Sequence, residues 1–289
     1  MPISLFLMVQ YFPLNAVVPP AAENTITEGA LVGAFSVSAV KQVHFSQGNL
    51  QYQASTNTWR FASQQYSYIG NAVGNTTAYE ERAQQEAWID LFGFGTSGWN
   101  SGAAIYQPWE IRPDNTTYYI GDDPSIGLTG NYARADWGVN NKISNGGNET
   151  GIWRTLTFAE WTYLLESRAD KYALATIESV MGLLLLPDAF TLPAGCTYTA
   201  GVADGYNTNV YTLSQWMMMQ DAGCVFLPTA GYRSNLSVTN VGTQGRYWST
   251  DVRGDTYSQC VYILVSGVNL TYCNRSNGLS VRLVKDISH

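Results

Sequence analysis

The sequence predicts one large, loop-rich domain in which short β-strands outnumber a few capped helices. Short segments alternate apolar and polar residues, two apolar runs stop at a proline, and two segments begin with helix-capping residues. The chain has 289 residues, 45% of them hydrophobic, and can bury a substantial core. Its 19 Tyr, 9 Trp and 27 Gly, against 13% charged residues, are typical of surface-exposed or secreted domains whose loops are closed by aromatic packing.

Residues 1–32 differ in composition from the rest of the chain. An apolar run at 3–9 has no basic flank and is followed by three prolines before residue 21. The run is too short to span a bilayer. It has the length of a secretory signal without the positive segment, and a strand over 4–12 fits equally well. With 15–28 as an extended linker, we expect 1–32 to be a leader, tether or assembly strand and 33–289 to be the main domain.

In the first part of the main domain, the sequence predicts strands followed by a buried loop. Gly48 and Asn49 supply a turn between two strands, and His44 falls inside one strand, where a structural role is expected. Residues 80–87 are a short polar helix candidate. The glycines and aromatics of 88–99 predict a buried loop, because glycine lets the backbone approach large rings closely. The strand segments are 35–38, 41–46, 50–52 and 59–61.

Two helices are predicted from their capping residues. Thr157 is a candidate N-cap and Glu160 completes a capping box. The apolar residues that follow share one face, which predicts a core helix over 158–168. A second helix is predicted over 212–222, capped near its start by Thr212 or Ser214 and ended by the glycine that follows.

The C-terminal half predicts scaffold strands around a polar centre. The apolar runs 182–187 and 224–228 stop at proline and predict buried strands, and 229–234 predicts a loop. Residues 247–249 couple two large aromatics to a polar turn, whereas 280–284 alternate as in a half-buried strand. Both of these ends predict a fixed scaffold.

Residues 251–277, between those ends, have the composition of a binding surface. The segment is rich in Tyr, Ser, Asn, Asp, Gly, Arg and Cys, and its only largely apolar run is 260–265. Tyr offers large rigid contact area, while Ser, Gly and Asn supply adaptable hydrogen bonds, as in antibody paratopes. A hairpin with long polar loops is the alternative.

The net charge and the His and Cys residues argue against several classes of function. A formal net charge of −7 argues against a non-specific nucleic-acid binder, and two His residues are too few for a histidine metal site or a Ser-His-Asp triad. The cysteines show no CxxC spacing, so zinc and thioredoxin-like sites have no support, and none, one or two disulfides are possible. The acidic turn 121–124 could bind calcium or be merely solvated. The four cysteines are Cys196, Cys224, Cys260 and Cys273.

Several segments spread over about residues 33–286 are similar in residue sequence and in order to segments of a known family. They include FSVSAVKQVHFSQGNLQYQ, WIDLFGFGTSGWN, DWGVNNKISNGGN, WRTLTFAEWTYLL, LLLPDAFTLPAG, VFLPTAGYR, GRYWST and GLSVRLV. In these segments the chain resembles the formylglycine-generating-enzyme-like branch of the C-type lectin fold, including variable proteins of diversity-generating retroelements from gut bacteria and phages. The resemblance implies an α+β domain whose C-terminal strands and loops form an exposed ligand-binding face.

In diversified members of that branch, template adenines are copied with errors, so variable codons end in C or T. Such codons cannot encode Lys, Glu, Gln, Trp or Met. Between Asp251 and Asn277 these five types occur once, at Gln259, whereas they make up 43 of the 289 residues of the chain. The deficit agrees with a diversified segment at about 232–277.

The resemblance also implies two alternative functions. Members that oxidise a protein cysteine to formylglycine use a closely spaced, copper-binding cysteine pair, to which 271–275 is faintly similar. Because Cys260 lies on a predicted strand 13 residues before Cys273, we expect no second thiolate close by. The alternatives are a cysteine in a polar loop and a disulfide between Cys260 and Cys273. The motifs of calcium-dependent lectins are absent, and Gln-Pro-Trp at 107–109 lacks their carboxylate. Calcium-independent glycan binding remains an alternative.

We therefore predict a non-catalytic, exported ligand-binding protein of a cell surface or virion, without cofactor, metal, nucleic-acid partner or membrane span. Its ligand is expected to be a protein or glycan on another cell or particle. Tyr257, Tyr262, Tyr272 and Arg253 should dominate the contact, and alanine replacements there should leave stability unchanged. The expected contact residues are Asp251, Val252, Arg253, Asp255, Tyr257, Tyr262, Asn269, Tyr272, Asn274 and Ser276, with Tyr232, Arg233 and Arg246 at the margin.

Overall fold

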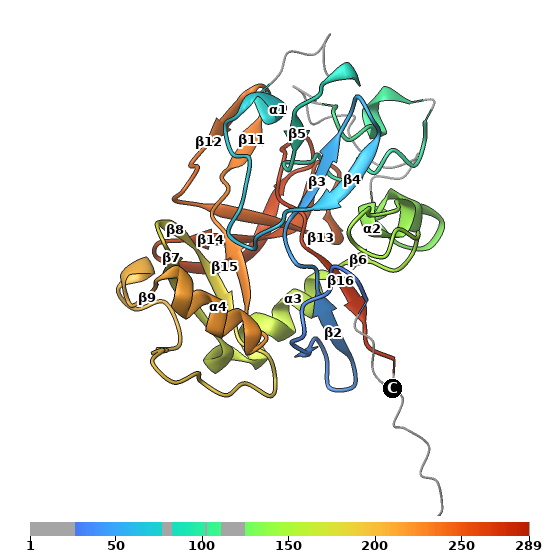
Figure 1. Ribbon diagram of the computed structural model, residues 1–289. Helices are drawn as coiled ribbons and strands as arrows, with labels where there is room; N and C mark the ends of the chain where they lie inside the picture. Colours follow the sequence, from blue (N-terminus) through green and yellow to red (C-terminus); the bar gives the residue numbers. More distant parts are fainter. Residues whose placement is uncertain (1–26, 77–82, 102, 111–124, 289) are drawn as a thin grey trace, which may run out of the picture.

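Strands dominate the fold (Figure 1). The computed structural model describes residues 27–76, 83–101, 103–110 and 125–288. Within these ranges sixteen strands form five sheets, with short helices between them. This mixture agrees with the predicted α+β class. In the same ranges, no helix combines the length and apolar character needed to cross a membrane.

One four-stranded sheet brings the two ends of the domain together. Its order is β1-β2-β16-β6, all antiparallel. His44 on β2 has the structural role expected of it, because its Nδ1 lies 2.9 Å from the carbonyl oxygen of Gly33. The described residues before Gly33 are hydrogen-bonded to the body, with Leu31 N donating to Phe45 O at 2.9 Å. The strands are β1 (Phe35–Ser36), β2 (Gln42–Phe45), β6 (Arg154–Thr155) and β16 (Leu283–Asp286).

A three-stranded sheet, β4-β3-β5, follows in the chain. The turn at Gly48 and Asn49 does join two strands, but β2 and β3 belong to different sheets. Asn49 is fully buried, and its Nδ2 donates to the hydroxyl of Tyr247 at 3.3 Å. The loop predicted at 88–99 is confirmed in part: residues 89–97 are buried, but Trp88 and Ile89 form a strand of this sheet and residues 98–99 are half-buried. The strands are β3 (Leu50–Gln53), β4 (Thr58–Phe61) and β5 (Trp88–Ile89).

Both apolar runs that stop at proline are buried strands, as predicted. They are β8 (Val180–Leu185) and β10 (Val225–Pro228), which pair in the sheet β10-β8-β7-β9 with β7 (Tyr172–Ile177) and β9 (Asn209–Tyr211). The predicted second helix is α4 (Leu213–Asp221), which packs Trp216 and Met219 against this sheet. Its Thr212 capping box is present, and Gly223 follows with φ +90°.

The predicted core helix is α3 (Phe158–Thr162), continued by a π-helical turn, η4 (Tyr163–Ser167). Thr157 Oγ1 accepts from Glu160 N at 3.1 Å, while Thr157 N donates to the Glu160 carboxylate at 2.9 Å. The capping box is therefore confirmed. The remaining helices are α1 (Val73–Thr76), α2 (Trp137–Asn140), η2 (Ala104–Tyr106), η3 (Gly130–Ala135), η5 (Ala169–Lys171) and η6 (Gly205–Asn207).

Two expectations for the C-terminal half are wrong. The predicted loop at 229–234 contains β11 (Tyr232–Ser234), which pairs with β12 (Ser237–Thr239). Residues 280–284 are not half-buried, because every one of them is buried and β16 begins only at Leu283. Arg282 can lie inside because its guanidinium donates to Gln65 Oε1 at 2.8 Å.

Several expectations fall on residues that are not described. The apolar run 3–9, the strand candidate 4–12 and nearly all of the linker precede residue 27. The acidic turn 121–124 and the first part of the helix candidate 80–87 also lie outside the described ranges.

Two buried carboxylates make stability depend on pH. Asp90 accepts from Ile69 N at 2.7 Å, and Asp136 accepts from Thr155 N at 2.8 Å. Burial outweighs these hydrogen bonds and raises the pKa of each carboxylate to about 6. Since a raised folded-state pKa favours folding most at low pH, this stability is fully present below the ordinary pKa near 4. It is lost as the pH rises through about 6.

We expect the melting temperature to fall as the pH rises from about 5 to 7. Differential scanning calorimetry should show the fall at low salt and also at about 0.5 M salt, which screens surface repulsion but not buried groups. Below about pH 4 stability should decline again, because ion pairing with Arg154, acting against burial, lowers the pKa values of Glu160 and Asp286. A flat profile between pH 5 and 7 would contradict the assignment to Asp90 and Asp136.

Candidate functional site

The expected binding segment is a three-stranded antiparallel sheet that crosses the middle of the molecule (Figure 1). Its strands are β13 (Gly245–Arg253), β14 (Tyr257–Leu264) and β15 (Gly267–Asn274), in that order. The polar residues therefore lie on strands joined by two short turns, and the alternative of a hairpin with long polar loops is wrong. The polar turn expected at 247–249 is also wrong, because Trp248 pairs with Cys260 within the ladder.

The two faces of this sheet contact different cores. Trp248, Cys260 and Cys273 pack into one hydrophobic cluster, whereas Tyr247 and Val261 pack into another that includes α3. Directly opposite residues share a face. The Trp248 face carries Arg246, Trp248, Val252, Ser258, Cys260, Tyr262, Asn269, Thr271 and Cys273, and the Tyr247 face carries Tyr247, Arg253, Tyr257, Gln259, Val261, Ile263, Leu270, Tyr272 and Asn274.

An exposed aromatic patch, defined as Arg253, Tyr257 and Tyr272, lies on the Tyr247 face beside the β13–β14 turn. The two tyrosine rings meet edge-on with centroids 5.0 Å apart and are 40% and 38% exposed. The Arg253 guanidinium carbon lies 4.1 Å from the Tyr272 ring centroid. Asp255 is exposed in the adjoining turn, and half-buried Asn274 pairs with Tyr257. The structure thus brings together three of the four residues expected to dominate the contact.

Tyr262, the fourth expected residue, lies on the opposite face of the sheet. Its ring and that of Tyr232 enclose Arg246, whose guanidinium carbon lies 4.1 Å and 3.3 Å from the respective ring centroids. Tyr262 is half-buried, and exposed Asn269 pairs with it. Tyr262 and Tyr232 therefore pack on the scaffold and are separated from the aromatic patch by the sheet.

Three of the expected contact residues do not point outward. Arg233, Arg246 and Ser276 are only 2%, 9% and 7% exposed, so that expectation is wrong for them. Arg233 donates to the carbonyl of Leu91 at 3.2 Å, and Arg246 lies between two tyrosine rings. Ser276 is buried because the chain after β15 folds back onto the β13–β14 turn, with Arg275 N donating to Thr256 O at 3.1 Å.

Asp251 and Val252 also serve the scaffold. Val252 is half-buried and packs against the core cluster of the Trp248 face. One carboxylate oxygen of Asp251 accepts from Phe158 N at 2.7 Å and from Thr250 Oγ1 at 3.0 Å. Phe158 begins α3, so Asp251 satisfies an N–H that the helix itself leaves unpaired and places negative charge at the helix N-terminus.

Replacing Asp251 by alanine is expected to lower the free energy of unfolding by roughly 1–3 kcal/mol, because it leaves the Phe158 N–H without its charged acceptor. Urea denaturation measures the change. Asp255→Ala is the matched control, since this exposed turn residue should change stability by no more than about 0.5 kcal/mol. Equal stability of the two variants would show that the Asp251 contact contributes nothing.

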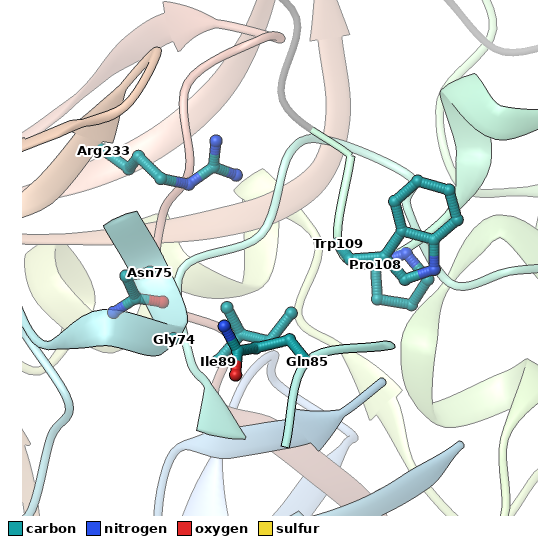
Figure 2. A pocket seen from close by; sticks show the side chains of 7 residues that line it. All are labelled: Gly74, Asn75, Gln85, Ile89, Pro108, Trp109 and Arg233. Atoms are coloured by element: carbon teal, nitrogen blue, oxygen red, sulfur yellow. The ribbon is translucent and has the colours of Figure 1, made fainter. Parts of the chain in front are cut away.

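A small cavity next to β11 is too small for a ligand. Figure 2 shows the Arg233 side chain reaching toward the space beside Asn75 and Trp109. The cavity volume is about 10 Å³, enough for about one water molecule. Pro108 and Trp109, from the segment most similar to a lectin triplet, form part of its wall.

Two of the four thiols lie side by side. All four cysteines are buried and free. Cys260 and Cys273 have their sulfurs 2.8 Å apart, so the expectation that Cys273 lacks a second thiol nearby is wrong. Pairing of β14 with β15 brings these two cysteines together although they are far apart in the sequence. Across the described part of the chain, no cluster of three or more His, Cys, Asp or Glu side chains is suited to hold a metal ion.

Two residues that belong to the site were not expected. Gln259 pairs with Tyr272 on the Tyr247 face, and the two-residue period of β14 from Tyr257 could have identified it. Arg275 is fully buried and donates to the carbonyls of Gly254 at 2.7 Å and Tyr257 at 3.2 Å. No sequence pattern distinguishes this arginine from an exposed one.

No protein-family model, curated protein or solved structure matches this chain.

Proposed function

We propose that this chain is a non-catalytic ligand-binding protein that uses a C-type lectin-like scaffold and makes contact through the β13–β15 sheet. The aromatic patch carries the proposal. Tyr257 and Tyr272 expose large rings beside Arg253, and the next strand positions, Ser258 and Cys273, are buried on the opposite face of the sheet. Tyr and Arg supply most of the energetic hot spots of protein interfaces, so this group has the chemistry of a recognition surface.

The paired strands and Arg275 hold the aromatic patch in place, so binding should cost little conformational entropy. Tyr257 and Tyr272 lie on neighbouring paired strands, and Arg275 ties the β13–β14 turn to the end of β15. Ring contact and the nearby guanidinium further restrict the side chains. A surface held in its binding geometry loses less conformational entropy on association.

We also propose that the surface is diversified. Arg253, Tyr257 and Tyr272 are all of types that codons ending in C or T encode, and they stand outside the two cores. The test is genomic. A reverse-transcriptase gene and a near-copy of the 3′ coding segment, differing at adenines, should lie beside this gene, and their absence would leave an undiversified binding protein.

The protein is proposed to be exported and displayed on a cell surface or virion. The composition break near residue 33 and the aromatic body with only 15 Lys and Arg residues support this location. Cell fractionation with an antibody against the domain should find the full chain at the envelope or on particles. A chain found only in the cytosol, unattached to any particle, would contradict export.

The ligand is proposed to be a protein or glycan of another cell or particle. Purified full-length chain should be titrated against a glycan panel and a panel of surface proteins, each with and without a chelator. Binding that survives chelation and disappears on mutation of the aromatic patch supports the proposal. Chelator-resistant binding to glycans alone identifies the calcium-independent lectin alternative, and saturable binding elsewhere on the chain contradicts the assigned surface.

Oxidation of a peptide cysteine is less well supported by the geometry. Cys260 and Cys273 are close enough to act together, but they are 0% and 2% exposed. A peptide cysteine would have to pass the packed side chains of the Trp248 face to reach either sulfur. Copper-dependent oxidation of a cysteine-containing peptide by the purified protein would overturn the non-catalytic proposal.

A further inference from the structure

The sulfurs of Cys260 and Cys273 lie side by side on the Trp248 face. In the ladder Cys260 is directly opposite Thr271, and Cys273 is directly opposite Ser258, so the two cysteines are diagonal neighbours on β14 and β15. Their sulfurs are 2.8 Å apart. A disulfide bond is about 2.05 Å long, so the sulfurs need to approach by only about 0.8 Å to form one.

The surroundings of the pair distinguish the two thiols chemically. The Tyr262 hydroxyl lies 3.1 Å from the Cys273 sulfur, and the Arg246 guanidinium is held close by between two tyrosine rings. Burial raises the pKa of Cys273, but hydrogen bonding with Cys260 and Tyr262 and the charge of Arg246 outweigh it and lower that pKa. Burial and the neighbouring sulfur raise the pKa of Cys260. Cys273 is therefore the better nucleophile.

The position of β15 gives an oxidant a route to Cys273. Among the described residues, β15 pairs with β14 and with no other strand, so it is an edge strand of this sheet. Local opening of an edge strand costs less free energy than global unfolding. Separation of β15 from β14 would uncover Cys273 while β13 and β14 stay paired.

We propose that Cys260 and Cys273 are a modification site, which a small disulfide oxidant such as glutathione disulfide converts into a disulfide bond across β14 and β15. The Cys273 thiolate attacks one glutathione sulfur, which breaks the glutathione disulfide and releases one glutathione thiolate. Cys260 then loses its proton and attacks the Cys273 sulfur of the mixed disulfide, which releases the second glutathione. Two protein thiols are oxidised, and one glutathione disulfide is reduced to two glutathione thiols, which take up the two protons.

The bond would lock the register of the hairpin that carries Tyr257 and Tyr272. Slippage of β15 against β14 by one residue would move the Tyr272 ring to the face of the sheet opposite Tyr257. A bond between two residues 13 apart in the sequence lowers the conformational entropy of the unfolded chain. Oxidation should therefore raise the melting temperature by about 5 °C. The inference does not depend on the proposed function, because the pair either oxidises or does not, whatever the aromatic patch binds.

The test uses the full-length chain with its four cysteines. Reduced protein is incubated with glutathione disulfide, free thiols are blocked with N-ethylmaleimide in denaturant, and the peptides are mapped by mass spectrometry without reduction. The expected product is a single cross-link joining the peptides of Cys260 and Cys273, with the other two cysteines blocked as thiols. Four blocked thiols, a cross-link through Cys196 or Cys224, or a stable glutathione adduct on Cys273 alone would overturn the proposal.

Matched serine variants separate this pair from the other two cysteines. Cys196→Ser should still lose two of its three remaining thiols to the same cross-link, whereas Cys260→Ser should form no internal bond. The wild-type peptide map is decisive even where a variant fails to fold. Calorimetry on oxidised and reduced wild-type protein then tests the stabilisation, and an oxidised form that melts at the same temperature or lower would contradict the locked register.

Discussion

Simultaneous replacement of Arg253, Tyr257 and Tyr272 by alanine is expected to abolish ligand binding while leaving the melting temperature almost unchanged. Truncation of a hot-spot aromatic or Arg costs roughly 2 kcal/mol or more of binding free energy, so the combined loss should exceed about a thousandfold in affinity even without full additivity. The patch contributes little to either core, and exposed substitutions usually change stability by about 0.5 kcal/mol or less. Titration against the best-binding glycan or protein of the panels measures the affinity, and calorimetry measures the melting temperature.

The control for this variant is an exposed apolar pair on another part of the surface. Leu213 and Met217 of α4 are 42% and 57% exposed, and their double alanine variant should bind as the wild type does. Tyr262→Ala provides a second comparison, because loss of its packing on Arg246 should lower stability. If the triple variant unfolds, its side chains are part of the core and the patch is wrongly assigned. If it folds and binds normally, recognition occurs elsewhere.

Replacing Arg275 by alanine is expected to cost roughly 3 kcal/mol or more of unfolding free energy, because it removes hydrogen bonds to two carbonyl groups and leaves a cavity where a fully buried side chain lay. The guanidinium holds the carbonyls of Gly254 and Tyr257, so the β13–β14 turn should loosen as well. Urea denaturation gives the stability change. Titration at a temperature at which the variant is still folded should show weaker binding, although Arg275 does not reach the surface.

Two further arginine variants distinguish this role from a simple charge effect. Arg275→Lys keeps the charge, but an ammonium group lacks the planar fork that donates from separate nitrogens, so it should recover only part of the stability. Arg253→Ala removes an equal charge from an exposed position and should leave stability within about 0.5 kcal/mol. An Arg275→Ala variant as stable as Arg253→Ala would show that the buried guanidinium does not hold the turn.

Local signals in the sequence determined the scaffold elements. The capping boxes at Thr157 and Thr212 predicted the starts of α3 and α4, because a cap involves residues three apart in the chain. The apolar runs before Pro187 and Pro228 predicted β8 and β10, because their burial follows from composition alone. The sequence likewise placed Arg253, Tyr257 and Tyr272 in a polar, aromatic segment, which is where the exposed patch lies.

Only the tertiary structure decided which side of the sheet each residue of that segment occupies. Neighbouring positions on a strand point to opposite faces, so the pairing register separates Tyr262 from Tyr257 and Tyr272. Burial of Arg233, Arg246 and Arg275 depends on carbonyls and rings contributed by distant segments, which no local pattern reveals. The contact between Cys260 and Cys273 has the same origin, because two thiols far apart in sequence become neighbours only after β14 and β15 have paired.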